Sequence, residues 1–162
     1  IDIGSLSTGS LFITILLMFI GASPGSTGGG IKTTTAFAIF LSLSGLIRRR
    51  QPVAFNRKIP SESITRAFQV LLLALVTVTT GILIISISEG ERFSFMQTVF
   101  EVVSAYGTVG LSTGITPVLG TISKFVLMMV MFIGRLGPIT VATSLSARES
   151  VLKHIEERIF IG

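Results

Sequence analysis

The segment from residue 106 to residue 111 has the clearest potential for chemistry in this sequence. A cation that leaves water must be surrounded by oxygen atoms instead, and backbone carbonyls can supply them. Small or β-branched residues beside glycine, as in Thr108, Val109 and Gly110, allow successive carbonyls to face one axis. We therefore predict an ion-binding filter with these members: Tyr106, Gly107, Thr108, Val109, Gly110 and Leu111.

The flanking segments would place this filter inside a membrane. Residues 93–105 form an apolar helix of roughly half the ~20 residues that a membrane span requires, and a long apolar helix follows from Val118 to Ser146. This order predicts a re-entrant pore loop, in which the negative end of the short helix favours a cation. Thr108-Val109-Gly110 matches part of the T-V-G-Y-G run of potassium channels, whereas an ordinary glycine turn is the alternative.

A glycine-rich loop (residues 21–33) interrupts another apolar stretch. Five glycines and one proline fall within residues 21–30, so regular helix is excluded there, although residues 11–20 and 36–47 look helical. Such a break survives in a membrane only inside protein or beside water, and we predict that it forms a gate beneath the filter. The predicted gate residues are Gly21, Ser23, Pro24, Gly25, Ser26, Thr27, Gly28, Gly29, Gly30, Lys32 and Arg135.

The same loop approximates the nucleotide-binding pattern G-x-x-x-x-G-K-T. Its register is wrong, because Ile31 occupies the lysine position and Lys32 comes one residue late. A phosphate loop also follows a strand, and here the flanks are apolar helices. We therefore predict no nucleotide binding at this loop.

Two charged residues fall within the apolar segments. Arg135 lies in the long last helix, and we predict that it reaches the carbonyls of the glycine-rich loop; a side chain that extends to the membrane boundary is the alternative. Glu101 lies two turns before the filter. It either hydrogen-bonds the filter backbone from behind or is a solvated residue at an interface.

Composition indicates an integral membrane protein. The chain is 49% hydrophobic with a mean hydropathy of +0.82, and 13% of its residues are charged, against about 25% in soluble domains. There is no cysteine and one histidine, His154, which excludes thiolate metal sites and most zinc chemistry, and we expect no cofactor and no enzymatic activity. The net charge is +5, and its basic residues gather at 48–66 and after 147, which predicts a cytoplasmic loop, a cytoplasmic C-terminus and an outer loop at 88–94. An anionic-lipid or nucleic-acid patch is the alternative for the basic loop, and we expect no nucleic acid.

An internal repeat supports this organisation. Met18-Phe19-Ile20-Gly21 recurs as Met131-Phe132-Ile133-Gly134, and the same offset pairs Ser10 with Ser123. We therefore expect four regions: residues 1–50 as the end of one repeat, 51–63 as a cytoplasmic loop, 64–146 as a complete helix–pore–helix repeat, and 147–162 as a cytoplasmic tail. The repeat register also predicts that Ile1 follows an earlier pore loop within a longer protein. The predicted fold class is an all-α integral membrane protein of potassium-channel-like helix–pore loop–helix repeats, with one helix broken by an intramembrane loop.

The sequence resembles the Trk/Ktr/HKT superfamily of potassium transporters, most closely the C-terminal part of the bacterial Ktr membrane subunit. The matching segments are 21–33, 100–112, 134–138 and 156–162. The resemblance implies four joined repeats around one pore, of which this chain has the end of the third and the fourth, and therefore cannot close a pore alone. It implies that Gly110 is the filter glycine, residues 21–30 the gate, and Arg135 the arginine beneath the filter.

The resemblance also implies a multi-pass plasma-membrane protein that takes up K⁺, with Na⁺ coupling left open. Its implied partners are the lipid membrane, a second copy in a homodimer, and a cytosolic ring of nucleotide-binding regulatory subunits. A non-conducting membrane anchor or assembly subunit is the alternative function. A membrane-attached nucleotide hydrolase that depends on Lys32 is a third reading, for which we expect no ATP binding.

Overall fold

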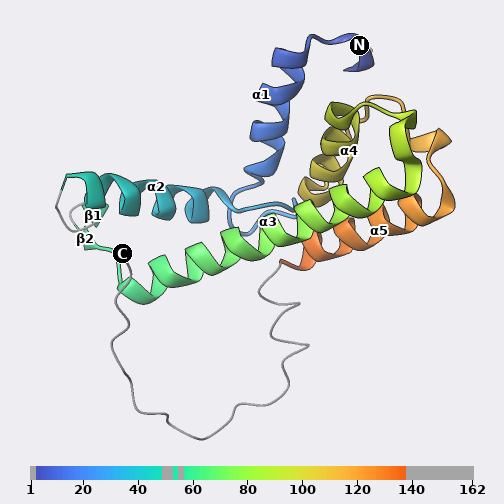
Figure 1. Cartoon of the computed structure of the whole chain (residues 1–162). Helices are drawn as coiled ribbons and strands as arrows, with labels where there is room; N and C mark the ends of the chain where they lie inside the picture. The colour runs from blue at the N-terminus through green and yellow to red at the C-terminus, as the bar shows by residue number, and fades with distance from the viewer. Residues whose placement is uncertain (1–2, 49–52, 55–56, 138–162) are drawn as a thin grey trace, which may run out of the picture.

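The computed structural model describes residues 3–48, 53–54 and 57–137, and these are mainly helical (Figure 1). The α-helices are α1 (Thr8–Phe19), α2 (Thr33–Ile47), α3 (Ser61–Glu89), α4 (Phe95–Gly107) and α5 (Thr121–Leu136). Short 3₁₀ turns occupy Ile3–Ser5 (η1), Gly90–Arg92 (η2) and Thr116–Val118 (η3). Two short strands, β1 (Val53–Ala54) and β2 (Arg57–Lys58), pair antiparallel between α2 and α3. The prediction of a helical protein is confirmed, apart from this small hairpin.

Helix α3 is the longest element and runs the length of the molecule (Figure 1). Among the described residues it is the one helix that is long and apolar enough to cross a membrane. The N-cap of α3 is a proline and not one of the nearby serines, Ser61 and Ser63. Pro60 occupies the N-cap position with the extended backbone that proline favours, and its carbonyl accepts the N–H groups of Ser63 and Ile64.

The other helices pack around α3. Helix α2 lies beside its first half and α5 beside its second half, while α4 is held between α1 and the α3–α5 pair (Figure 1). The core is centred on α4, and the largest fully buried side chains are those of Tyr106, Phe100, Ile85, Val102 and Ser123. A short helix surrounded on several sides is what the predicted re-entrant position requires.

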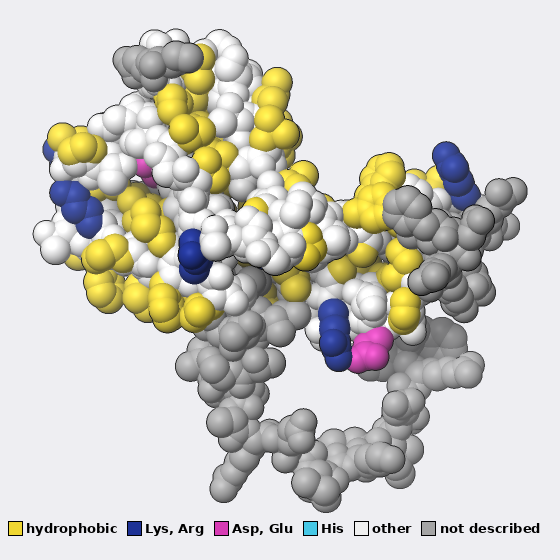
Figure 2. Space-filling view, turned by 180° about the vertical axis from the view of Figure 1, so that it is seen from behind, with side chains coloured by type: hydrophobic (Ala, Val, Ile, Leu, Met, Phe, Trp, Pro, Cys, Tyr) yellow, Lys and Arg dark blue, Asp and Glu magenta, His cyan; other side chains and the backbone are white. Residues whose placement is uncertain are grey.

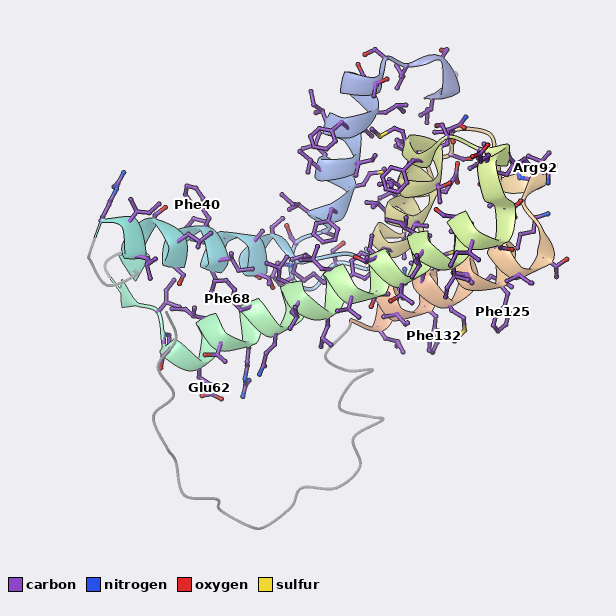
Figure 3. The ribbon with its side chains drawn as sticks, viewed as in Figure 1. Phe40, Glu62, Phe68, Arg92, Phe125 and Phe132 are labelled. Carbon is purple, nitrogen blue, oxygen red and sulfur yellow. The ribbon has the colours of Figure 1, made fainter. Side chains whose placement is uncertain are left out.

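Large apolar side chains also cover the outside of the molecule. Hydrophobic side chains spread over the face seen in Figure 2, with few charged ones between them. Phe125 and Phe132 extend from α5 away from α3 (Figure 3), and more than half of each is exposed. An outer surface of this kind suits contact with lipid or with further apolar helices rather than with water.

The predicted break between the first two helices is present. Helix α1 ends at Phe19 and α2 begins at Thr33, and the two run in clearly different directions in Figure 1. The two ends of the glycine-rich loop are joined side by side: Gly21 N donates to the carbonyl of Ile31 at 2.8 Å, and Ile31 N donates to that of Phe19 at 3.2 Å. The loop is therefore closed at its base and is not an extended linker.

The boundaries of the pore segment differ from the prediction. Helix α4 begins after Ser94, which forms a capping box with Gln97, and continues to Gly107. Tyr106 and Gly107 are therefore helical and not extended as predicted, and their place in the filter stays a prediction. The sequence pattern missed this because glycine is permitted, although disfavoured, at the end of a helix.

The last helix is also shorter than the predicted Val118–Ser146. Pro117 lies in the 3₁₀ turn η3, so α5 starts only at Thr121, and it ends where Gly137 adopts a φ of 87°. Residues 138–146 lie outside the described residues, as does the predicted tail from 147 to 162. Arg135 is consequently in the last turn of α5. The prediction had placed it inside a longer helix.

Candidate ion-conducting site

The predicted filter leaves the C-terminal end of α4 through Thr108. This residue adopts a left-handed backbone (φ 52°), which turns the chain back along the helix. Val109 N then donates to the carbonyl of Ser104 at 3.0 Å, and the hydroxyl of Ser104 donates to the carbonyl of Leu111 at 2.6 Å. Ser104 thus holds both ends of the short segment from Val109 to Leu111. One lone pair of the Leu111 carbonyl is directed back at α4.

The rest of the filter segment is open. Val109, Gly110 and Leu111 are exposed, and Gly110 has a φ of 84° that favours glycine. A cavity of about 500 Å³ borders Thr108, Gly110 and Leu111. The same cavity is lined by Glu101 and Ser104 of α4 and by Met131 of α5, so it lies between the filter segment and these two helices.

The side chain of Tyr106 is buried, and its ring contacts another aromatic ring. The ring packs against Phe19 of α1 with centroids 6.0 Å apart. Its hydroxyl is buried and has no hydrogen-bond partner among the described residues. The Tyr106 side chain thereby connects the end of α4 to Phe19, the last residue of α1 before the glycine-rich loop.

The glycine-rich loop reaches the filter directly. Gly29 N donates to the Oγ1 of Thr108 at 2.8 Å. A Cβ on Gly29 would lie 2.9 Å from both the Tyr106 carbonyl oxygen and the Thr108 Cγ2. Only glycine permits this approach, so the structure brings together two predicted sites that are far apart in the sequence.

The other predicted gate residues of this loop divide into a group that packs against other residues and an exposed group. Gly28, Gly29 and Gly30 belong to the packed group, and a Cβ on Gly21 would overlap the Gly29 carbonyl oxygen. Ser23, Pro24, Gly25, Ser26 and Thr27 form an exposed turn. Lys32 joins the two groups, because its Nζ donates to the carbonyls of Gly28 at 2.7 Å and Ser26 at 3.4 Å.

Arg135 is not brought to this loop. It is exposed at the end of α5, and among the described residues it makes no hydrogen bond or ion pair with residues 21–30. Its buried neighbour Gly134 is the residue of α5 that meets the C-terminal end of α4, since a Cβ there would overlap the Tyr106 carbonyl oxygen. The repeat had marked Gly134 in the sequence, but nothing indicated this contact.

Neither alternative for Glu101 holds as predicted, because the residue is buried and its partners follow the filter segment rather than belonging to it. It is 5% exposed, and its carboxyl accepts hydrogen bonds from Ser112, Thr113 and Thr116, the residues that follow the filter. The sequence did not indicate Ser104, Ser112, Thr113 or Thr116. One signal was available: Glu101 and Ser104 are three residues apart, and so lie on one face of a helix.

A second carboxylate, that of Glu89, connects the end of α3 to the start of α5. Glu89, the last residue of α3, accepts from Gly120 N at 2.7 Å and from Ser123 Oγ at 2.6 Å at the start of α5. Its other oxygen lies 3.6 Å from Arg92. Ser123 is fully buried, and the bond from Gly120 N satisfies the backbone N–H of the N-cap residue of α5.

Comparison with known proteins agrees with this architecture. The model of a family described as TrkH, cation transport protein, matches residues 1–151. The chain is similar to Ktr system potassium uptake proteins B and D of Bacillus subtilis (strain 168), with 40% and 41% identity, and to the potassium/sodium uptake protein NtpJ of Enterococcus hirae, with 36%. Each alignment covers 100% of this chain but only 36% or 38% of the relative. The chain therefore spans little more than a third of the length of these curated relatives.

Proposed function

Because this chain belongs to the TrkH family of cation transport proteins, we propose that it supplies one filter segment and the gate of a membrane potassium uptake protein. The relatives named above are potassium uptake proteins, which supports K⁺ as the transported ion. Since the chain is about a third of their length, the proposed pore is completed by further repeats outside this sequence. Residues 64–146 would be the fourth repeat, and residues 1–50 the end of the third.

The hydrogen bond from Gly29 to Thr108 is the observation that carries this proposal. A K⁺ ion would exchange its water for the carbonyls of Thr108, Val109 and Gly110, at the negative end of α4. The glycine-rich loop is directly against the inner end of that segment, where it would obstruct the ion. A single hydrogen bond contributes about 1 kcal/mol, so the loop can leave this position at low cost.

Lys32 supports movement of the loop as a unit. Its two bonds to loop carbonyls, together with the pairing at the base, hold the loop in one shape. We propose that the loop swings away from Thr108 without unfolding. In this proposal Arg135 adds positive charge beneath the filter and sets the height of the electrostatic barrier.

The proposed setting is a multi-pass protein of the plasma membrane. The basic loop after α2 would be cytoplasmic, and the turn between α3 and α4 would face outward. The proposed partners are lipid, a second copy in a homodimer and a cytosolic nucleotide-binding regulatory ring. The potassium/sodium name of one relative supports Na⁺ as a candidate coupling ion.

Rubidium uptake by the complete protein tests the proposal. In a strain deficient in potassium uptake, the unmodified protein should restore Rb⁺ uptake, and Gly110→Ser should reduce the preference for Rb⁺ over Na⁺. Glu91→Gln, at an exposed residue outside the filter and the glycine-rich loop, serves as a control that leaves both unchanged. If the unmodified protein reaches the membrane and carries no Rb⁺, the anchor or assembly function is the better reading.

A further inference from the structure

We propose that Glu101 is a positioning residue for ion selectivity, which holds the chain that leaves the filter against the pore helix. The inference rests on the proposed function, since it assigns a task within the filter. The chain in question is the return limb (residues 112–116), which follows the filter segment and leads to η3. No ion contact by Glu101 is involved.

The return limb is attached to Glu101 by its backbone and its hydroxyl groups together. Oε1 accepts from Ser112 Oγ at 2.8 Å, from Thr113 N at 2.8 Å and from Thr113 Oγ1 at 3.0 Å. Oε2 accepts from Thr116 Oγ1 at 2.6 Å. Four donors from three residues thus converge on one carboxyl, which suits a carboxylate because it has about four acceptor sites and no donor.

The surroundings make these bonds strong and hard to replace. Glu101 is 5% exposed and Thr113 7% exposed, so water does not compete freely for either. Among the described residues no lysine or arginine forms an ion pair with Glu101. Among the described residues, the hydrogen bonds from the return limb are therefore what stabilises the carboxylate, and its loss would leave the two buried donors of Thr113 unpaired.

Ser104 extends the same support to the filter itself. It is one turn after Glu101 on α4, is buried, and donates to the Leu111 carbonyl at 2.6 Å. Glu101 accepts hydrogen bonds from residues that directly follow Leu111. Ser104 binds Val109 and Leu111 themselves. One face of α4 thereby fixes both sides of the segment whose carbonyls would select the ion.

This arrangement predicts a specific defect. Selection between K⁺ and the smaller Na⁺ depends on how the carbonyls are held, whether through cavity size or through the number of carbonyls in reach. If the return limb were released from Glu101, the carbonyls of Val109 and Gly110 could move to positions in which they also coordinate Na⁺. The preference for K⁺ over Na⁺ should then fall even when the amount of protein in the membrane is little changed.

The test uses the complete protein in a potassium-uptake-deficient strain. Glu101→Gln keeps the size of the side chain but places an NH₂ group among hydrogen-bond donors. We expect the ratio of Na⁺ to Rb⁺ uptake to rise about tenfold, the change that corresponds to one charged hydrogen bond. Thr116→Val removes one donor to Oε2 and keeps the charge, so a smaller rise of the same kind is expected.

Glu62→Gln is the matched control. Glu62 is exposed at the opposite end of α3 from α4, where it pairs only with Arg66 (Figure 3). The ratio should be unchanged in this variant. The KM values for Rb⁺ and Na⁺, measured at equal amounts of membrane protein, separate a selectivity defect from a loss of folded protein.

The outcomes separate this inference from the proposed function. If the unmodified protein carries Rb⁺ and Glu101→Gln, present in the membrane, keeps its Na⁺ to Rb⁺ ratio, Glu101 is a structural residue only and the inference is wrong. If Glu101→Gln does not accumulate, Thr116→Val decides in the same way. A failure of the unmodified protein to carry Rb⁺ would instead overturn the proposed function.

Discussion

The backbone N–H of Gly29 donates a hydrogen bond to the Oγ1 of Thr108 at 2.8 Å. Gly29 is in the middle of the glycine-rich loop, and Thr108 is the first residue after the pore helix. The bond joins the two segments that would obstruct and select an ion. It explains why the loop has glycine where its chain meets the filter, because a side chain at residue 29 would meet the Tyr106 carbonyl.

Replacing Gly29 should favour the open position of the loop. In Gly29→Ala the added Cβ would lie within 3 Å of Thr108 and of the Tyr106 carbonyl, so the loop cannot return to its observed position. We expect maximal Rb⁺ uptake to rise about threefold to tenfold, as when a closing segment is displaced. Glu62→Gln, at an exposed residue outside the loop, should leave uptake unchanged.

Thr108 offers a second measurement of the same contact. Thr108→Val removes the acceptor of the Gly29 N–H and keeps the shape of the side chain, whereas Thr108→Ser retains the hydroxyl. Uptake should rise in the first variant and remain near normal in the second. Equal uptake in both variants would contradict a role for this hydrogen bond in closure.

Glu89 should contribute to stability and not to selectivity. Glu89→Gln weakens the bonds to Gly120 N and Ser123 Oγ, which join the end of α3 to the start of α5. Loss of a charged hydrogen bond between the two helices weakens their association, so the Tm of the purified protein in detergent should fall. The adjacent Glu91→Gln is the control, since Glu91 is exposed. An unchanged Tm in Glu89→Gln would show that the helices are held together by apolar packing alone.

Gly134 and Arg135 should give different defects although they are neighbours. Gly134→Ala adds a Cβ that overlaps the Tyr106 carbonyl, so α5 must move away from α4, and less folded protein should reach the membrane. Arg135→Ala removes an exposed charge and should leave folding intact while Rb⁺ uptake changes. Quantitative blotting together with uptake distinguishes the two. Normal uptake in Arg135→Ala would remove the arginine from the proposed barrier.

The helical framework and the break in it were predictable because they depend on local chemistry. Apolar runs of known length specify the helices, and five glycines with a proline exclude helix between Gly21 and Gly30. The segment ends were less predictable. Gly107 continues α4 and Pro117 delays α5, since a helix end depends on which backbone groups find partners nearby.

The sequence by itself determined the membrane class, the glycine-rich loop and the candidate filter, since each follows from residue types within one short segment. The tertiary structure alone decided which of these segments meet. It placed Gly29 against Thr108, Gly134 against the Tyr106 carbonyl and Glu101 against the return limb, and it left Arg135 exposed. Contacts between distant segments depend on how α1, α4 and α5 pack, and a hydrogen bond needs its donor within about 3 Å of its acceptor. Periodicity and spacing along the chain do not contain that information.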